Sequence, residues 1–389
     1  MTPIDLSHHG DREVRETTPS TTVQLVDFAV NVAVPAPPPW LRSQLEKALG
    51  DVAAYPDVEP AVDALCRLHG CSPASVLVTN GAAEAFTLIA RGRHWRRPVV
   101  VHPQFTEPES ALAANGYSVA RLILSPDNGF ELDPSQVDED ADLVIIGNPT
   151  NPTSRLHPRA TILGLLRPGR VVVVDEAFMD VVAHQGDSVL DDAVRGEGLV
   201  VIRSLTKTFG LAGIRAGYVV GDSIVVAECA ATQPHWSVNS LAVAATVACA
   251  GARGQEHVRA VSRDVTVRLS YLVSKLTAAG LDVVRDPAGP FVLVHHPAAA
   301  RLREGLRHQG IAVRRGDTFP GLGPQWLRIA AREPDATDAL LTAVTHELAV
   351  IGNGSNTSAS SHSSHSSHNT ATNDSHEPAI MAQQNRDLG

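Results

Sequence analysis

Short apolar runs alternate with longer amphipathic stretches through the middle of the chain. Between about residues 77 and 220, the apolar runs fall at residues 76–78, 99–101, 143–146, 171–174 and 199–202. They are uniformly apolar and rich in β-branched residues, which is typical of strands buried on both faces of a parallel sheet. The pattern therefore predicts an α/β fold in which helices cover a mostly parallel sheet and the crossovers are right-handed.

The region after residue 254 has a different pattern. A helical period at residues 256–279 precedes strand-like residues 281–285 and 291–295, a helix near 299–309, strands at 311–314 and 326–330, and a helix near 335–348. We interpret residues 255–351 as a smaller α+β domain beside a large α/β domain of residues 41–254. Residues 1–40 are predicted to be an extended, substrate-contacting arm. The Ser-, His- and Asn-rich residues 352–389 are predicted to be a disordered tail.

Composition and charge narrow the class of protein. Of 389 residues, 43% are hydrophobic and 19% are charged, and the formal net charge is −10. That charge disfavours nucleic acid as a partner, and no apolar run is long enough to span a membrane. The N-terminus lacks the pattern of a signal peptide, and four cysteines without a CxxC pair predict neither a disulfide framework nor a metal site. We therefore expect a cytoplasmic protein without a metal.

Polar side chains follow the ends of the predicted strands. The first strand leads into Asn80-Gly81-Ala82-Ala83, where small residues at a helix start leave N–H groups bare for an anion. The later strands lead to Phe105, Asn151, Asp175, Phe178, Ser204, Thr206 and Lys207, with Arg215 further on. Because ligands bind beyond the carboxyl ends of parallel strands, we expect these side chains in one crevice. The chain has only two other lysines, Lys47 and Lys275.

These residue types fit the chemistry of pyridoxal 5′-phosphate. A lysine bonds covalently to its aldehyde, and an aspartate keeps its ring nitrogen protonated, so that the ring withdraws electrons. Helix-start N–H groups, hydroxyls and an arginine hold its phosphate, while an aromatic side chain stacks on the ring. A dinucleotide dehydrogenase is disfavoured, because the chain has no GxGxxG fingerprint.

Several motifs together resemble the class I/II aminotransferases of fold type I. They are SLTK at residues 204–207 with LAGIR at 211–215, NPTNPTS at 148–154, VDEAF at 174–178 and YPD at 55–57. The order and spacing agree from about residue 27 to 332. The resemblance implies that Lys207 carries the cofactor, that Asp175 pairs with the ring nitrogen, and that Asn151 binds the ring hydroxyl. It further implies contacts to the cofactor from Gly81, Ala82, Ala83, Phe105, Phe178, Ser204, Thr206 and Arg215.

The resemblance extends to an oligomeric state and to one branch of the family. In this family the residue matching Tyr55 reaches the cofactor phosphate of the neighbouring subunit, which implies a homodimer. The arm resembles that of the L-threonine-O-3-phosphate decarboxylases of cobalamin synthesis, which are close relatives of histidinol-phosphate aminotransferases. By that resemblance the substrate phosphate is held by His8, Asn31 and Arg314, and its carboxylate by Arg328.

The arm also departs from that branch. His9 and Asp11 replace its usual Gly and Asn, and Asp11 would repel a phosphate unless Arg12 or Arg15 neutralises it. Phe178 fits the decarboxylases, because most aminotransferases have tyrosine there.

The reaction type stays open between two enzymes. Whichever bond at the substrate Cα is held perpendicular to the cofactor ring is the one that breaks, and Lys207 removes the proton when that bond is C–H. We expect a threonine-phosphate decarboxylase of cobalamin biosynthesis, or an aminotransferase of histidinol-phosphate type with 2-oxoglutarate as acceptor. The alternative of another class is a non-catalytic regulatory module that binds the cofactor. It is disfavoured because no basic recognition helix precedes the fold.

Overall fold

The structure is a computed structural model, and it describes residue 6 and residues 10–17 and 25–360. The prediction for His8 therefore lies outside the described residues, as does most of the predicted tail. In the described part of the chain, no helix is long and apolar enough to cross a bilayer.

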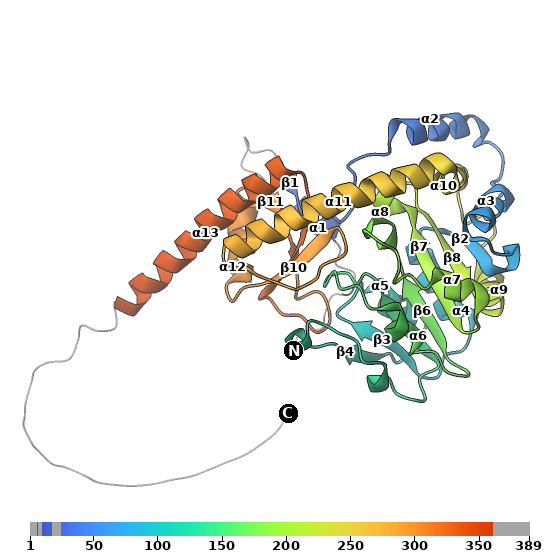
Figure 1. Cartoon of the computed structure of the whole chain (residues 1–389), viewed down its shortest axis with the longest axis horizontal. Coiled ribbons are helices and arrows are strands. Elements are labelled where there is room, and N and C mark those ends of the chain that lie inside the picture. The colour runs from blue at the N-terminus through green and yellow to red at the C-terminus, as the bar shows by residue number, and fades with distance from the viewer. Residues whose placement is uncertain (1–5, 7–9, 18–24, 361–389) are drawn as a thin grey trace, which may run out of the picture.

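A seven-stranded sheet forms the centre of the larger part of the molecule (Figure 1). Its spatial order is β2 (Val76–Asn80), β8 (Ala216–Gly221), β7 (Leu199–Ser204), β6 (Val171–Asp175), β5 (Leu143–Gly147), β3 (Pro98–His102) and β4 (Ala120–Ile123). All of these strands run parallel except β8, which is antiparallel to both of its neighbours. The predicted α/β class and the five apolar strands are confirmed, whereas β4 and β8 were not predicted.

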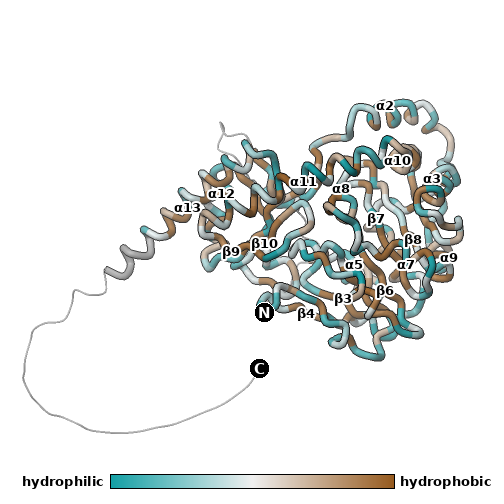
Figure 2. Tube along the Cα trace, in the orientation of Figure 1, coloured by the Kyte–Doolittle hydropathy of each residue, from teal (hydrophilic) through white to brown (hydrophobic). Residues whose placement is uncertain are grey.

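Helices cover both faces of this sheet because its side chains alternate between two cores. On one face, Val173 and Ile145 pack in a cluster with residues of α4 (Ala82–Gly92), α5 (Glu107–Ala114) and α9 (Ser223–Thr232). On the other face, Val172 and Ile146 share a cluster with residues of α2 (Pro39–Ala48), α3 (Glu59–His69), α6 (Arg159–Leu163), α7 (Leu190–Arg195) and α10 (Ser240–Ala250). Figure 2 shows this burial pattern: the central strands are coloured as hydrophobic, whereas the helices around them carry both hydrophobic and hydrophilic residues.

A second sheet lies in the C-terminal part of the chain. Its antiparallel order is β12 (Arg314–Arg315), β13 (Trp326–Ala330), β10 (Phe291–His295) and β9 (Asp282–Val283). Apolar residues of α11 (Ala252–Ala278), α12 (Ala299–His308) and α13 (Pro334–Ser360) pack with this sheet in one core. In Figure 1, α11 runs from this sheet to the larger part of the molecule. Short 3-10 turns lie at η1 (Leu49–Asp51), η2 (Pro73–Ser75), η3 (Pro126–Asn128), η4 (Pro134–Gln136) and η5 (Met179–Val181).

The structure differs from the predicted arm and tail in two places. The arm is not extended throughout, because it contains helix α1 (Gly10–Glu16) and strand β1 (Val26–Asp27), which pairs with β11 (Ile311–Ala312). Helix α13 continues past residue 351 to Ser360. Two helices also cross the predicted domain boundaries: α2 begins at Pro39 and α11 at Ala252.

Candidate active site

A cavity of about 570 Å³ opens beyond the carboxyl ends of β6 and β7, beside the arm and the second sheet. It brings together most of the residues predicted from the sequence: Asn31, Ala82, Ala83, Phe105, Asn151, Asp175, Phe178, Ser204, Thr206, Lys207, Arg215, Arg314 and Arg328. They come from both sheets and from the arm, so the site exists only where these three parts meet.

Lys207 lies on the short helix α8 (Leu205–Phe209), directly after β7. Its Nζ donates to Asn31 Oδ1 at 3.4 Å and lies 5.8 Å from the centre of the Phe178 ring. Burial, followed by the positive charge of Arg328, lowers the pKa of Lys207 to about 8, although Asp175 opposes this shift. A substantial fraction of the amine is therefore neutral near physiological pH, which is the form that bonds to an aldehyde or accepts a proton.

Asp175 is the last residue of β6, and its pKa is shifted in the opposite direction to that of Lys207. Burial raises the pKa of its carboxyl to about 6, even though the N–H of Ala177 donates to Oδ1 at 3.1 Å. A buried carboxylate of this kind is stabilised by a cationic partner. The protonated ring nitrogen of pyridoxal phosphate would supply that partner.

An anion cradle lies at the start of α4. Gly81 caps this helix with φ +75°, and a Cβ there would come within 2.6 Å of Arg215 Nη2, so glycine lets the guanidinium approach the helix start. Thr206 Oγ1 is buried and has no hydrogen-bond partner among the described residues. An orphan hydroxyl, bare helix N–H groups and an arginine on one cavity wall fit a phosphate. Gly81 itself does not line the cavity, and its role there is to make room for Arg215.

Two buried arginines of the second sheet face the same cavity. Arg328 Nη1 donates to Asn151 Oδ1 at 2.6 Å and Nη2 donates to the Ala29 carbonyl oxygen. Burial, followed by the charge of Arg314, lowers the pKa of Arg328 to about 9. Arg314 packs over the Phe319 ring, with 4.9 Å from Cζ to the ring centre, and burial lowers its pKa to about 10. Both guanidiniums would gain from an anionic ligand, because burial without enough negative charge disfavours their charged form.

Tyr55, like Gly81, is a predicted site residue that does not line the cavity. Its side chain is 77% exposed and stacks on Trp236 with 4.4 Å between ring centres. It lines separate surface grooves. Near the cavity, Asp11 forms an ion pair with Arg15 at 2.9 Å, so Arg15 supplies the predicted neutralising charge.

Three further residues belong to this region and were not predicted as site residues: Gly10, Glu13 and Phe319. Gly10 and Phe319 line the cavity, and Glu13 forms an ion pair with Arg314 at 3.7 Å. An extended arm has no helix face at residues 10–16, and nothing local in the sequence indicates that Glu13 meets a residue 301 positions away.

The chain belongs to the aminotransferase class I and II family, whose pattern matches residues 23–344. A histidinol-phosphate aminotransferase of Mycobacterium tuberculosis is 44% identical over 328 residues, covering 84% of this chain and 86% of the relative. The threonine-phosphate decarboxylase of Salmonella typhimurium is 28% identical over 364 residues, covering 90% of this chain and 99% of the relative. The solved histidinol-phosphate aminotransferase from Clostridium acetobutylicum has the same fold, with a TM-score of 0.75, 22% identity, and coverage of 82% of this chain and 98% of that one.

This protein is therefore an enzyme that uses pyridoxal 5′-phosphate, as its family does. Bound there, the cofactor supplies an electron-withdrawing ring that stabilises negative charge developing at the substrate Cα. The residues on the cavity wall fit it: Lys207 would carry the aldehyde, Asp175 would pair with the ring nitrogen, and Thr206 with the helix start would hold the phosphate.

Proposed function

We propose that this enzyme decarboxylates a small phosphorylated amino acid, L-threonine O-3-phosphate, as do the cobalamin-synthesis enzymes that its arm resembles. The supporting observation is that two buried arginines, Arg328 and Arg314, line the cavity that contains Lys207. Their charges suit one ligand with two anionic groups: a carboxylate beside the amino group and a phosphate further out. Asn31 and His8 would assist at the phosphate.

The proposed roles follow from how the side chains are held. Arg328 is fixed by Asn151 and by the Ala29 carbonyl, so a carboxylate bound to it has a defined direction. If that direction places the carboxylate bond perpendicular to the cofactor ring, carbon dioxide leaves, because only this bond overlaps the electron-withdrawing system. The protonated amine of Lys207 would then donate a proton to Cα, where the bond to the carboxylate was broken. Phe178 has no hydroxyl group, so it cannot donate a hydrogen bond to the ring oxygen of the cofactor. Electron withdrawal by the ring would then depend on Asp175, which would keep the ring nitrogen protonated.

A second candidate is transamination of histidinol phosphate with 2-oxoglutarate as acceptor. It is favoured by the 44% identical relative, which carries the name histidinol-phosphate aminotransferase. In this reaction Lys207 would act as general base on the Cα–H bond. Arg314 would bind the phosphate of one substrate, and Arg328 a carboxylate of the other.

The two candidates give different products. We would incubate the cofactor-loaded enzyme with L-threonine O-3-phosphate, and separately with histidinol phosphate plus 2-oxoglutarate. Release of carbon dioxide without glutamate supports decarboxylation, and formation of glutamate supports transamination. Turnover of neither compound would overturn both candidates and require a different amino acid substrate.

We further propose that the enzyme is a homodimer through the surface around Tyr55. Exposed apolar side chains gather there: Val52, Tyr55, Trp236 and Val247. Two shallow grooves lined by residues 51–56 and 236–248 join them. An apolar surface of this kind is typical of an interface between subunits. A second copy of the chain would also bring its Tyr55 to the cofactor phosphate, and the molar mass in solution tests the dimer.

A further inference from the structure

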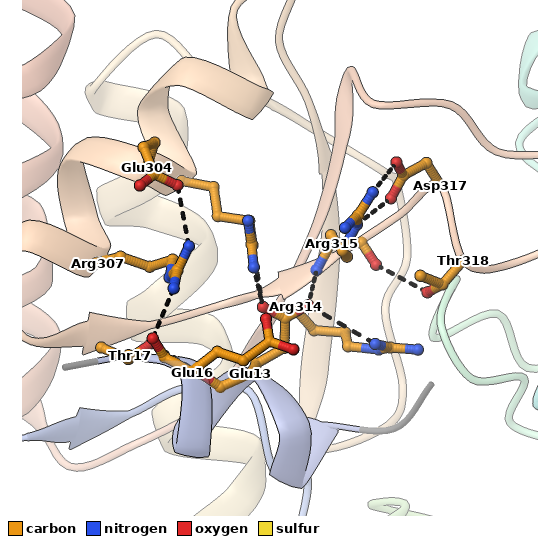
Figure 3. A network of polar contacts seen from close by, with 10 residues as sticks. Glu13, Glu16, Thr17, Glu304, Arg307, Arg314, Arg315, Asp317 and Thr318 are labelled. Atoms are coloured by element: carbon orange, nitrogen blue, oxygen red, sulfur yellow. Dashed lines mark hydrogen bonds and ion pairs between the residues drawn. The ribbon is translucent and has the colours of Figure 1, made fainter. Parts of the chain in front are cut away.

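Glu13 is a buried carboxylate on the helix that begins the described arm. It is 1% exposed, although its neighbours Asp11, Arg12 and Arg15 are exposed. Oε2 accepts two hydrogen bonds from Arg303, one of them from Nε at 3.0 Å. Oε1 faces Arg314 Nη1 at 3.7 Å and accepts from the Arg315 N–H at 3.5 Å, and Figure 3 shows this carboxylate between α1 and the strand that carries Arg314.

These contacts dock α1 onto the second sheet. Burying a carboxylate is costly unless cations and N–H groups compensate it, so the position of Glu13 is specified by its partners. Further along the helix, Arg307 Nη2 donates to the Glu16 carbonyl and Thr17 Oγ1 donates to that of Glu13 (Figure 3). Helix α1 is therefore held by charges of α12 and β12.

The docked helix forms the wall of the cavity next to both substrate arginines. Glu13 lies against Arg314 on one side, and Phe319 packs against the same guanidinium on another. At the start of α1, a Cβ on Gly10 would overlap the Ala29 carbonyl oxygen, which accepts from Arg328. Gly10, Asp11 and Arg15 then line the cavity itself.

Two arginines approach the Glu13 carboxylate to different degrees. Arg303 makes the closer contacts with the carboxylate, whereas Arg314 lies 3.7 Å away and lines the cavity. Glu13 itself does not line the cavity, so it contacts Arg314 from outside the space that a ligand would occupy.

We propose that Glu13 is a positioning residue that fixes Arg314 and helix α1, so that the cavity recognises a phosphate at the outer end of the substrate. This inference rests on the proposed function for the identity of that group. Glu13 touches neither the cofactor nor the reacting atoms, and it acts on substrate affinity through Arg314.

The test compares E13Q, E13D and the matched control E16Q, whose side chain is exposed on the same helix. With L-threonine O-3-phosphate and the cofactor-loaded enzyme, we expect E13Q to raise KM about tenfold and to leave kcat within about twofold, since it weakens a buried charged contact. E13D should recover part of the loss, and E16Q should match the parent. L-Threonine, which lacks the phosphate, should bind equally to all four proteins.

Two measurements decide the proposal without turnover. Hydrogen exchange of the α1 amides should be faster in E13Q than in the parent and E16Q, and the affinity for inorganic phosphate measured by calorimetry should fall about tenfold. Unchanged exchange and phosphate affinity in E13Q, or tighter phosphate binding, would overturn the role of Glu13. If the parent turns over neither phosphorylated compound while these two results hold, the proposed function fails and the role of Glu13 stands.

Discussion

At the scale of single residues, the site depends on two buried groups whose pKa values move toward each other. Lys207 is lowered to about 8 and Asp175 is raised to about 6, in both cases chiefly by burial. A pair of groups with opposite shifts in one cavity is what acid–base chemistry near neutral pH requires. Each shift predicts a different pH dependence.

For Lys207, the rate at which the cofactor-free protein takes up pyridoxal phosphate should rise with pH through about 8, because only the neutral amine bonds to the aldehyde. Removing the nearby positive charge in R328Q should move this midpoint upward by about 0.5–1 unit. Absorbance during reconstitution measures both midpoints. K47A is the control and should behave as the parent, while K207A should form no covalent link. A midpoint that R328Q leaves unchanged would contradict the electrostatic cause.

For Asp175, the sign follows from a folded-state pKa of about 6, above its ordinary 3.8. Its contribution to stability is full below the ordinary pKa and is lost as pH rises through about 6. In the cofactor-free protein, D175N should therefore raise the free energy of unfolding by about 1–3 kcal/mol at pH 8 relative to the parent, with a smaller gain at pH 5. Urea denaturation at both pH values measures it. An equal increase in the free energy of unfolding at pH 5 and pH 8 would show that the Asp175 carboxyl does not titrate between these two pH values.

The individual site residues could largely be predicted because strand ends impose their location. Asp175, Asn151 and Lys207 each follow an apolar run, and all three line the cavity. Glu13 and Gly10 could not be predicted in this way, since their places depend on contacts with Arg303, Arg314 and Ala29 that leave no periodic signal.

At the scale of elements, strand β8 sets the spacing between the anion cradle at the start of α4 and Lys207. It lies between β2, which leads into the cradle, and β7, which leads into Lys207. A Cβ on Gly217 of β8 would come within 2.7 Å of the Ala82 nitrogen, so glycine lets the start of α4 lie close to the sheet.

Replacing Gly217 with alanine should therefore displace the helix start and weaken cofactor binding. We expect G217A to lower the affinity for pyridoxal phosphate about tenfold or more and to destabilise the protein by about 1–3 kcal/mol, the usual cost of overpacking. Fluorescence titration and thermal unfolding measure the two effects. G186A adds the same methyl group where nothing lies within 4 Å and should change neither. Full cofactor affinity in G217A would refute the close approach as a requirement.

Strands with an uninterrupted apolar run could be predicted from the sequence, and the other strands could not. Strands β5, β6 and β7 are apolar at nearly every position, whereas β4 is largely exposed and β8 has glycine at residues 217 and 221. The same reasoning explains the arm: helix α1 spans seven residues, too few for its pattern to be distinguished from a turn.

At the scale of the whole molecule, a single chain presents a cavity with its cradle and lysine but with Tyr55 facing outward. The proposed dimer would complete each site with a side chain from the other subunit. This arrangement can be tested by mixing two inactive or impaired proteins.

Hybrids of K207A and Y55A subunits should regain activity. In such a hybrid one site has Lys207 and receives an intact Tyr55 from its partner, while the other has neither. Random reassortment of equal amounts makes about half of the dimers hybrid. We therefore expect about one quarter of the activity of the parent, measured after unfolding and refolding the mixture. Activity no higher than the mean of the two separate variants would rule out a shared site.

The pairing of β1 with β11 has a consequence for how the protein is made. Residues 26–27 hydrogen-bond beside residues 311–312, and the Phe28 N–H donates to the Ala312 carbonyl oxygen at 2.8 Å. Residues 26–27 must wait for a partner strand that is translated much later, and contacts so distant in sequence form slowly. The nascent polypeptide can build its large sheet before then, but it has no complete pocket, and hence no chemistry to perform, until the strand that carries Arg328 has also been made.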